Sequence, residues 1–201
     1  MGIVERIRAI VGERGVLDCR EAALRKAGIW RDDSIKARAI IRPRTTDELS
    51  AVLACCHAAG QVVVIHGGLT GLVRGADSTA SDIVLSLERM RDIEAMDPIG
   101  RTVTVQAGVP LQQVQEAAEA HGLMFPLDLG ARGSAQIGGN IATNAGGNRV
   151  IRFGMVRDMV LGLEVVLADG TVISALNQML KNNAGYDLKQ LFIGTEGTLG
   201  V

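Results

Sequence analysis

The stretch V-V-V-I-H-G-G-L-T-G-L-V-R-G, residues 62–75, decides the fold that we predict for this chain. It opens with four β-branched residues in a row, a pattern typical of a buried strand. The strand runs into Gly67 and Gly68, where missing Cβ atoms permit φ > 0 and leave the main chain open to a ligand. Bare N–H groups in such a turn form an anion site, to which Thr70 adds a hydroxyl donor. We therefore predict a diphosphate loop; the alternative is an empty tight turn after a core strand.

Two common nucleotide-binding motifs do not account for this loop. A Walker loop contains a Gly-Lys pair, and the chain has none. The dinucleotide fingerprint G-x-G-x-x-G is also missing, because Gly67 and Gly68 are adjacent and Leu69 stands where the second glycine would be. We expect the loop to hold its phosphates in another geometry.

The composition is that of a globular chain with clustered glycine. Of the 201 residues 47% are hydrophobic, which is enough for a sizeable core. A net charge of −1 and an aromatic content of 2% argue against nucleic-acid binding. The 25 glycines gather at residues 67–75, 130–147 and 194–200, which indicates backbone packed closely against a ligand.

Cysteine usage and hydropathy bear on the location of the protein. No apolar run approaches the length of a membrane span, and charges within Glu5–Arg8 argue against a secretory signal. Cys19, Cys55 and Cys56 have neither metal-ligand spacing nor a disulfide pattern. We expect reduced thiols and a cytoplasmic protein, with peripheral membrane association left open.

The first 90 residues show a strand–helix–strand order. Residues 3–14 predict an amphipathic helix closed by Gly15, and residues 19–38 an extended surface arm anchored by Trp30. A strand at residues 39–41 is followed by a capping-box pattern at residues 45–48, which opens a helix. Gly60 ends that helix, and strands follow at residues 62–65 and 83–87, which favours a parallel βαβ unit.

The second half contains a strand, a helix and a hairpin around another glycine-rich loop. Residues 102–106 alternate as a half-buried strand does, and Pro110 opens a helix closed by Gly122. Asp169-Gly170 between two apolar runs predicts a β-hairpin. Between these elements, Ser134 is a candidate N-cap for a helix over residues 135–143.

Two glycines inside that last helix indicate a ligand. Gly138 and Gly139 cost about 1 kcal/mol each in a helix. Such a cost persists where a flat group lies directly on the backbone, and Thr143 and Asn144 add donors and acceptors at the far end. An empty glycine-rich surface loop is the alternative.

These stretches, in this order, resemble the FAD-binding domain of the vanillyl-alcohol-oxidase type. The branch is that of FAD-linked oxidases around the glycolate oxidase catalytic subunit and the D-lactate and D-2-hydroxyglutarate dehydrogenases. The resemblance runs from about residue 40 to the end of the chain. The matching blocks are G-G-L-T-G-L (67–72), F-P-L-D-L-G-A (125–131), I-G-G-N-I-A-T-N-A-G-G (137–147), L-G-L-E-V-V-L-A-D-G (161–170) and F-I-G-T-E-G-T-L-G-V (192–201).

The resemblance implies an α+β fold that holds FAD between two subdomains. One is a small βαβ-containing subdomain, and the other is larger, with a mixed or antiparallel sheet and helices. We expect a helix and arm over residues 1–38 and the FAD-binding domain over residues 39–201. The residues that the resemblance places on the cofactor are Gly67, Gly68, Leu69, Thr70, Gly71, Leu72, Pro126, Leu127, Gly130, Ala131, Ser134, Ile137, Gly138, Gly139, Ala142, Thr143, Asn144, Gly146, Glu196, Gly200 and Val201.

Two positions depart from, or vary within, the family pattern. Relatives that attach FAD covalently here have a histidine directly after the paired glycines; this chain has Leu69, so we expect noncovalent FAD. Arg74 stands where the family usually has glycine, and we expect its side chain to point to solvent, with phosphate neutralisation as the alternative.

The implied function is oxidation of a small 2-hydroxy acid by hydride transfer to FAD, in an FAD-dependent oxidoreductase. The family has a C-terminal domain that supplies substrate and metal ligands, and we expect it to be absent here, which leaves an inactive fragment. A non-catalytic FAD-binding subunit that works with a partner chain is the alternative, and a nucleotide-binding regulator is a third possibility. His57, His66 and His121 are too scattered to assign a base, so no catalytic residue and no metal ligand is predicted.

Overall fold

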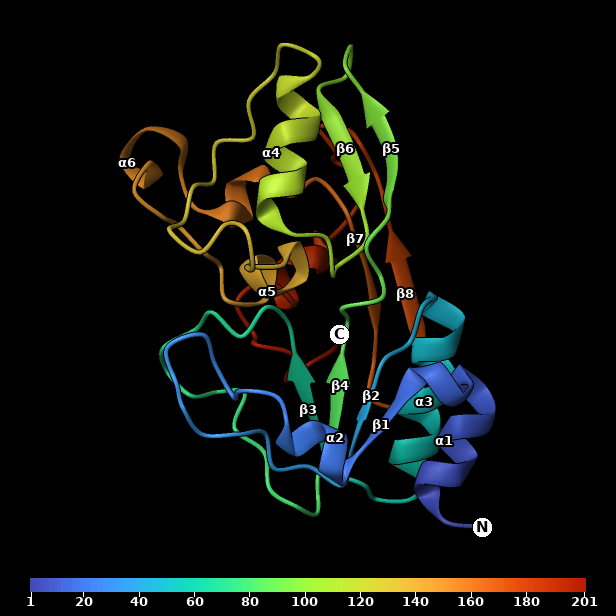
Figure 1. Cartoon of the computed structure of the whole chain (residues 1–201). Coiled ribbons are helices and arrows are strands. Elements are labelled where there is room, and N and C mark those ends of the chain that lie inside the picture. The colour runs from blue at the N-terminus through green and yellow to red at the C-terminus, as the bar shows by residue number, and fades with distance from the viewer. The chain divides into compact units, whose positions relative to one another are not determined.

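The structure is a computed structural model that describes residues 1–201, and the chain divides into two compact units (Figure 1). Unit 1 comprises Met1–Met90 and Val166–Val172, and unit 2 comprises Arg91–Val165 and Ile173–Val201. Residues 1–38, which the sequence sets apart, pack within unit 1. The domain boundary at residue 38 stays a prediction.

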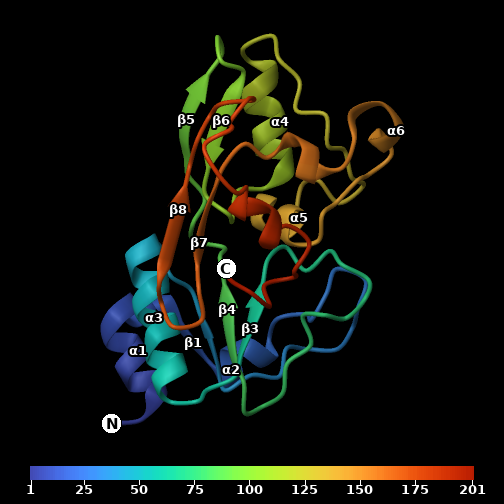
Figure 2. The same ribbon diagram turned by 180° about the vertical axis from the view of Figure 1, so that it is seen from behind.

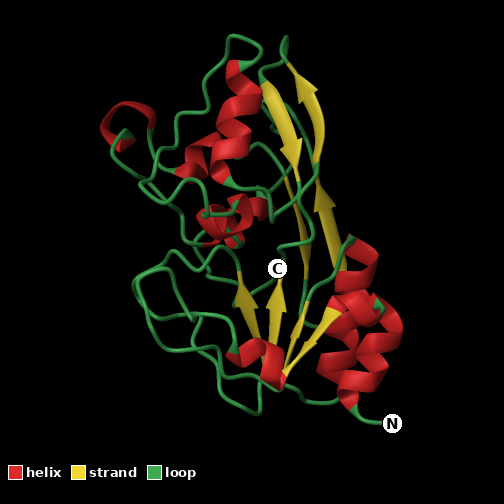
Figure 3. Ribbon diagram, in the orientation of Figure 1, coloured by secondary structure: helices red, strands yellow, loops and turns green.

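Unit 1 is built on a four-stranded sheet in the order β1-β2-β4-β3 (Figure 3). The predicted parallel pairing is confirmed, because β4 pairs in parallel with both β2 and β3. The antiparallel edge strand β1 was not predicted, since three residues are too few to show a period. The strands are β1 (Val16–Asp18), β2 (Ala39–Ile41), β3 (Val63–His66) and β4 (Ile83–Ser86).

Helices and the arm cover the two faces of this sheet. Side chains of successive residues point to opposite faces, so Ile40 and Val84 lie on one side with Ile35 of the arm. Helices α1 (Ile3–Val11) and α3 (Thr46–Ala58) lie next to each other beside the sheet, as Figures 1 and 2 show. Burial of each such side chain contributes about 1.5–3 kcal/mol, which explains why apolar runs form this layer.

The helix ends follow the sequence with small shifts. Helix α1 ends at Gly12, with φ 70°, rather than at Gly15. Helix α3 begins at the predicted cap, where Thr45 Oγ1 accepts a hydrogen bond from the Glu48 N–H at 3.1 Å. The Glu48 carboxylate reaches one residue further back than predicted and accepts from the Arg44 N–H at 2.7 Å. Gly60, with φ 59°, follows the last turn as predicted.

The predicted extended arm of residues 19–38 is wrong in two respects. Residues Cys19–Ala23 form the short helix α2, because Asp18 and Glu21 make a capping box around its first turn. Trp30 does not anchor the arm, since the residue is 77% exposed.

Unit 2 begins with a hairpin and a helix that share a core. Strands β5 (Ile93–Asp97) and β6 (Thr102–Val105) pair in antiparallel fashion. Strand β5 was not predicted, because most of its residues are exposed and show no apolar alternation. Helix α4 (Leu111–Glu119) packs on β6 (Figure 1) and begins one residue later than predicted, because Pro110 is its N-cap and not its first residue. The buried core consists of Val109, Leu111, Val114, Leu127, Ile137 and Val156.

The remaining elements are short. Helix α5 (Ile137–Ala142) begins after Gln136, so the predicted N-cap at Ser134 is wrong; the Ser134 N–H bonds the Ala131 carbonyl in a turn instead. The Asp-Gly hairpin is confirmed, with Gly170 at φ 90°. No helix combines the length and apolar character that a membrane crossing requires. The other elements are α6 (Val150–Phe153), β7 (Leu163–Val166), β8 (Val172–Ala175) and 3₁₀ turns at Glu13–Gly15, Val156–Met159 and Leu188–Leu191.

The α+β class is therefore confirmed, with a βαβ-containing unit and a second unit of antiparallel pairs and helices. The thiols also behave as predicted. Cys56 is buried, Cys55 is half-buried, and all three cysteines are free.

The two neighbouring glycines of α5 give a matched test of packing. A Cβ on Gly138 would stand 2.7 Å from the Ala107 Cβ, whereas a Cβ on Gly139 meets nothing within 4 Å. We expect Gly138→Ala to destabilise unit 2 by about 1–3 kcal/mol through overpacking. Gly139→Ala should leave stability unchanged or raise it by about 1 kcal/mol, because alanine favours helix. Thermal unfolding of both variants checks this, and equal melting temperatures would contradict the packing.

Candidate functional site

The glycine loop of unit 1 follows β3 at the carboxyl ends of the parallel strands. In open α/β sheets ligands bind at this edge. Positive φ in the segment falls on Leu69, at 53°, and Arg74, at 62°, and not on the paired glycines as we predicted. Gly71 leaves the backbone of the loop bare, because a Cβ added there would meet nothing within 4 Å.

A cavity of about 300 Å³ lies beside this loop. Gly67 and Leu69 line it from the loop, His66 and Ser86 from the ends of β3 and β4, and Glu88 from the segment after β4. Its lining thus combines bare backbone with polar groups at the carboxyl edge of the sheet. This arrangement suits an elongated polar ligand whose charged part meets main-chain N–H groups.

His66 is a buried neutral group at this edge. It is 3% exposed, and its Nε2–H donates to the Ala76 carbonyl at 2.8 Å. Burial lowers the pKa of His66, although the bond to Ala76 and the charge of Asp77 oppose the shift. The imidazole is therefore neutral near pH 7 and supplies no positive charge to the loop.

Glu88 joins two arginines at the same edge. Its carboxylate accepts from Arg25 at 2.6 and 3.1 Å and from Arg42 at 3.0 Å. Partial burial raises the pKa of Glu88, but hydrogen bonds from the two arginines outweigh it and the net shift is downward. The carboxylate therefore offsets one of the two positive charges that line or adjoin the cavity.

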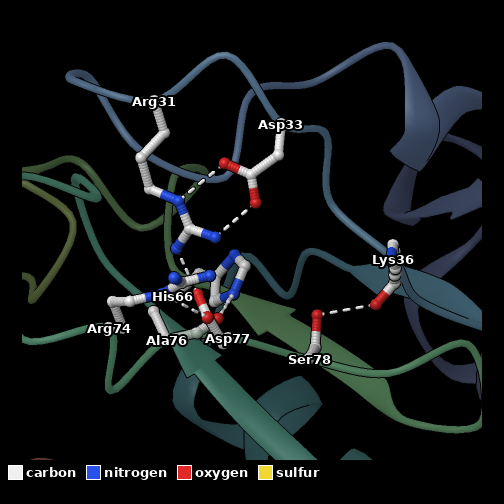
Figure 4. Close-up of polar contacts among 8 residues, drawn as sticks. All are labelled: Arg31, Asp33, Lys36, His66, Arg74, Ala76, Asp77 and Ser78. Atoms are coloured by element: carbon white, nitrogen blue, oxygen red, sulfur yellow. Dashed lines mark hydrogen bonds and ion pairs between the residues drawn. The ribbon is translucent and has the colours of Figure 1, made fainter.

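Arg31 and Asp77 are site-adjacent residues that the sequence did not reveal. Arg31 bridges Asp33 and Asp77, and Arg74 also bonds Asp77 at 2.9 Å, as Figure 4 shows. The Arg74 side chain is 68% exposed, so the prediction that it points to solvent is confirmed. Arg31 and Asp77 are 46 residues apart, and no local motif marks such a pair.

In unit 2 the structure brings three predicted site residues, Ala142, Asn144 and Glu196, together at the end of α5. The Glu196 N–H donates to the Ala142 carbonyl at 2.9 Å, and the Asn144 side chain accepts from the Arg157 N–H at 3.1 Å. Arg157 also donates to the Ile193 carbonyl at 2.5 Å, which holds the last segment of the chain in place. The Thr143 hydroxyl bonds the Gly139 carbonyl at 2.8 Å.

The other predicted residues of unit 2 fall into two groups. The side chains of Leu127 and Ile137 are buried in the core, and Gly138 and Gly146 are closely packed, so these four can offer a ligand only their backbone. The second group is half-buried or exposed, and a Cβ on Gly130 or Gly139 would enter open space. Its members are Pro126, Gly130, Ala131, Ser134, Gly139, Gly200 and Val201.

Two buried acceptors in unit 2 lack partners. Gln136 Oε1 and Asn140 Oδ1 have no hydrogen bond, and an unpaired buried polar group costs about 1–3 kcal/mol. Both lie one turn apart at the start of α5. We did not predict them as site residues, although Asn140 stands inside the quoted I-G-G-N block. A ligand with hydrogen-bond donors fits this pair.

The histidines remain unassigned as bases. His57 is exposed on α3, His121 is exposed after α4, and His66 is buried with Nε2 engaged. None of them is placed by the structure to act on a substrate.

Comparison with known families identifies the class of domain. Residues 37–176 match the family model described as FAD binding domain. The chain therefore belongs to the FAD-binding domain family, and its cofactor is FAD. In unit 1 the open space over Gly71 fits part of such a group. In unit 2 the open space over Gly130 and Gly139 and the unpartnered acceptors of Gln136 and Asn140 do so as well.

The chain is also similar to curated enzymes. It is 49% identical over 165 residues to the mitochondrial D-2-hydroxyglutarate dehydrogenase of Bos taurus, covering 82% of this chain and 30% of that protein. It is 45% identical over 166 residues to a putative mitochondrial D-lactate dehydrogenase of Schizosaccharomyces pombe, covering 83% and 32%. The chain thus spans about a third of the length of the relatives it matches.

A solved structure supports the fold. Alkyldihydroxyacetonephosphate synthase superposes with a TM-score of 0.85 at 19% identity, covering 99% of this chain and 38% of that one. At this identity the likeness shows the fold alone. The resemblance to FAD-linked oxidases is confirmed by these comparisons together.

The prediction of a cytoplasmic protein is contradicted. The D-2-hydroxyglutarate dehydrogenases of Bos taurus and Arabidopsis thaliana are named mitochondrial. The prediction rested on unpaired cysteines, which indicate a reducing compartment without saying which one.

The arginine-bound Glu88 predicts an acid-sensitive contribution to stability. A lowered folded-state pKa means that the contribution is complete above the ordinary value of 4.5 and is lost as pH falls through the folded-state value. We expect Glu88→Gln to lower the free energy of unfolding by about 1 kcal/mol at pH 7, a figure discounted for partial exposure, and by progressively less below pH 4.5. Denaturant melts between pH 3 and 7 measure this. Glu13→Gln, which removes an 81%-exposed partner of Arg8, is the control without such a trend.

Proposed function

We propose that this chain is the FAD-binding part of an oxidoreductase that oxidises a small 2-hydroxy acid. The observation that carries the proposal is the 49% identity to a D-2-hydroxyglutarate dehydrogenase over 82% of the chain. The similarity to a putative D-lactate dehydrogenase supports the same substrate class, an acid with a hydroxyl beside the carboxylate. Which acid is oxidised is decided outside the stretch that these proteins share.

In this function the residues of unit 1 would hold the diphosphate. The Gly67–Leu72 backbone supplies N–H donors, and Thr70 supplies a hydroxyl. His66 is neutral and supplies no charge at this edge, and Glu88 offsets one of the two arginine charges beside it. Anion binding would use the main-chain N–H donors of the glycine-rich turn.

The residues of unit 2 would lie along the rest of the cofactor. Gly130 and Gly139 leave the backbone bare, and Gln136 and Asn140 would accept hydrogen bonds from donors of the ligand. The segment at Glu196 is tied to Ala142, so both would be positioned together.

FAD would be bound without a covalent bond. Leu69 occupies the slot of the histidine that carries the bond in covalent relatives, and a leucine side chain has no nucleophile. His66, on the other side of the glycines, is buried with its Nε2 bonded to the Ala76 carbonyl. Acid precipitation should therefore release the flavin.

Bound flavin supplies the hydride acceptor in this chemistry. The residues of this chain would bind and orient it and exclude water from its phosphates. Proton removal from the substrate hydroxyl needs a base within hydrogen-bond reach, and we assign none to these residues. We place the substrate-binding groups in the part of the relatives that this chain does not match, or in a partner chain.

Gly71→Val tests the diphosphate loop. The residue has space for a side chain and no positive φ, so we expect the variant to fold while the valine blocks the ligand. Loss of one charge-assisted hydrogen bond costs about 1.5–3 kcal/mol, which is roughly tenfold or more in affinity. Gly185→Val, at another open glycine without positive φ, is the matched control. Fluorescence titration with FAD that gives equal affinities for both variants would place the phosphates elsewhere.

The FAD-loaded chain alone should not turn over a 2-hydroxy acid. The reacting atoms must be held about 3–3.5 Å apart, and loss of a general base costs roughly 10²–10⁴-fold in rate. We would follow dye reduction with D-2-hydroxyglutarate, D-lactate and glycolate. Turnover at about 1 s⁻¹ or faster, the low end for ordinary enzymes, would show that the catalytic groups lie within these 201 residues.

A further inference from the structure

Within the arm, residues 25–36 fold back on themselves ahead of the part that matches the family model. The Ala27 N–H donates to the Asp33 carbonyl and the Ile35 N–H to the Arg25 carbonyl, both at 2.9 Å. Ile35 is buried against the sheet, so the arm has a fixed base. It is therefore a folded element and not a loose tail.

The arm contacts the glycine loop and the segment after it at three points. The Ile29 N–H donates to the Leu69 carbonyl at 3.3 Å. Arg31 forms an ion pair with Asp77, and the Ser78 hydroxyl donates to the Lys36 carbonyl at 2.7 Å. One contact therefore lies inside the loop, and the other two lie in the segment directly after it, as Figure 4 shows for Asp77 and Ser78.

Arg31 is the central group of this contact. Its Nε donates to Asp33 at 2.7 Å, a second guanidinium nitrogen bonds Asp33, and the third bonds Asp77. Hydrogen bonds from Arg31 lower the pKa of Asp33 and of Asp77. A planar fork with five donors suits two carboxylates at once, and lysine, with a compact ammonium group, would replace it only in part.

The strained residues of the loop are the ones that these contacts hold. Leu69 and Arg74 have φ of 53° and 62°, a conformation that costs a residue other than glycine about 1–2 kcal/mol. Such strain persists where surrounding structure over-determines it. The Leu69 carbonyl is bonded to the arm, and the Arg74 side chain is bonded to the Asp77 that Arg31 grips.

We infer that Arg31 is a positioning residue that holds the glycine loop in the conformation that binds the FAD diphosphate. The inference rests on the proposed site for the diphosphate. The arm pre-forms the loop before the ligand arrives, so the cost of ordering is met in folding and not in binding. Arg31 itself acts through Asp77 and need not touch the phosphates, and the Ile29 N–H of the same arm bonds the Leu69 carbonyl.

Hydrogen exchange in the chain without FAD tests directly whether the contact of Arg31 with Asp77 orders the loop. We expect Arg31→Ala to speed amide exchange in residues 67–77 about threefold to tenfold, while residues 83–86 of β4 keep their protection. FAD affinity should fall by a similar factor, and Arg31→Lys should recover only part of both effects. Asp77→Asn is a second variant that removes the same ion pair by changing the carboxylate partner. Asp32→Asn, which breaks the exposed Lys26 pair within the arm, should change neither quantity.

The outcomes separate this inference from the proposed function. Unchanged exchange in residues 67–77 for both Arg31→Ala and Asp77→Asn would overturn the inference that Arg31 orders the loop through Asp77. Faster exchange with unchanged FAD affinity would overturn the role of Arg31 in binding. An equal effect of Asp32→Asn would assign the result to a general loss of charge in the arm. It would also overturn the inference that Arg31 orders the loop. If the parent chain binds no FAD, the proposed function fails, and the exchange result still decides whether Arg31 shapes the loop.

Discussion

The central position of β4 between β2 and β3 is the constraint on which unit 1 depends. All four residues of β4 are buried, and its register sets Leu85 beside both Ile41 and Ile65. Because the three strands are parallel, their carboxyl ends meet at one edge, where the glycine loop, Arg42 and Glu88 follow. The site-adjacent residues of unit 1 are thus brought together by strand pairing, although they are far apart in sequence.

Several charged groups at this edge are paired within the protein. Arg25 and Arg42 share Glu88, Arg31 bridges Asp33 and Asp77, and His66 is neutral because it is buried. A strong uncompensated cation cluster would bind any polyanion, whereas main-chain donors in a fixed turn select by shape. The specificity of such a loop therefore depends on how rigidly its backbone is held, and the arm contacts matter for this reason.

Features with a local signal in the sequence were predictable, and features that depend on contacts between distant residues were not. The apolar runs of β3 and β4, the cap at Thr45 and the Asp-Gly hairpin each have a local physical signal. The exposed strand β5 has no such signal, and neither does the Arg31–Asp77 pair. Trp30, the only tryptophan, is predicted as the anchor of the arm, yet it is 77% exposed and the neighbouring Arg31 makes the contact. The positive φ at Leu69 is another consequence of tertiary contacts, since leucine does not favour it.

Clustered glycine proved to have two physical meanings in this chain. A Cβ on Gly138 or Gly146 would meet neighbouring atoms at 2.7 Å, so these residues permit close packing inside unit 2. A Cβ on Gly71, Gly130 or Gly139 would enter open space, so these three leave bare backbone for a ligand. Glycine clustering alone therefore overstates the area of a binding site. The adjacent pair Gly138-Gly139 shows why both meanings occur in one motif: the first lets α5 approach Ala107 closely, and the second leaves the opposite backbone free.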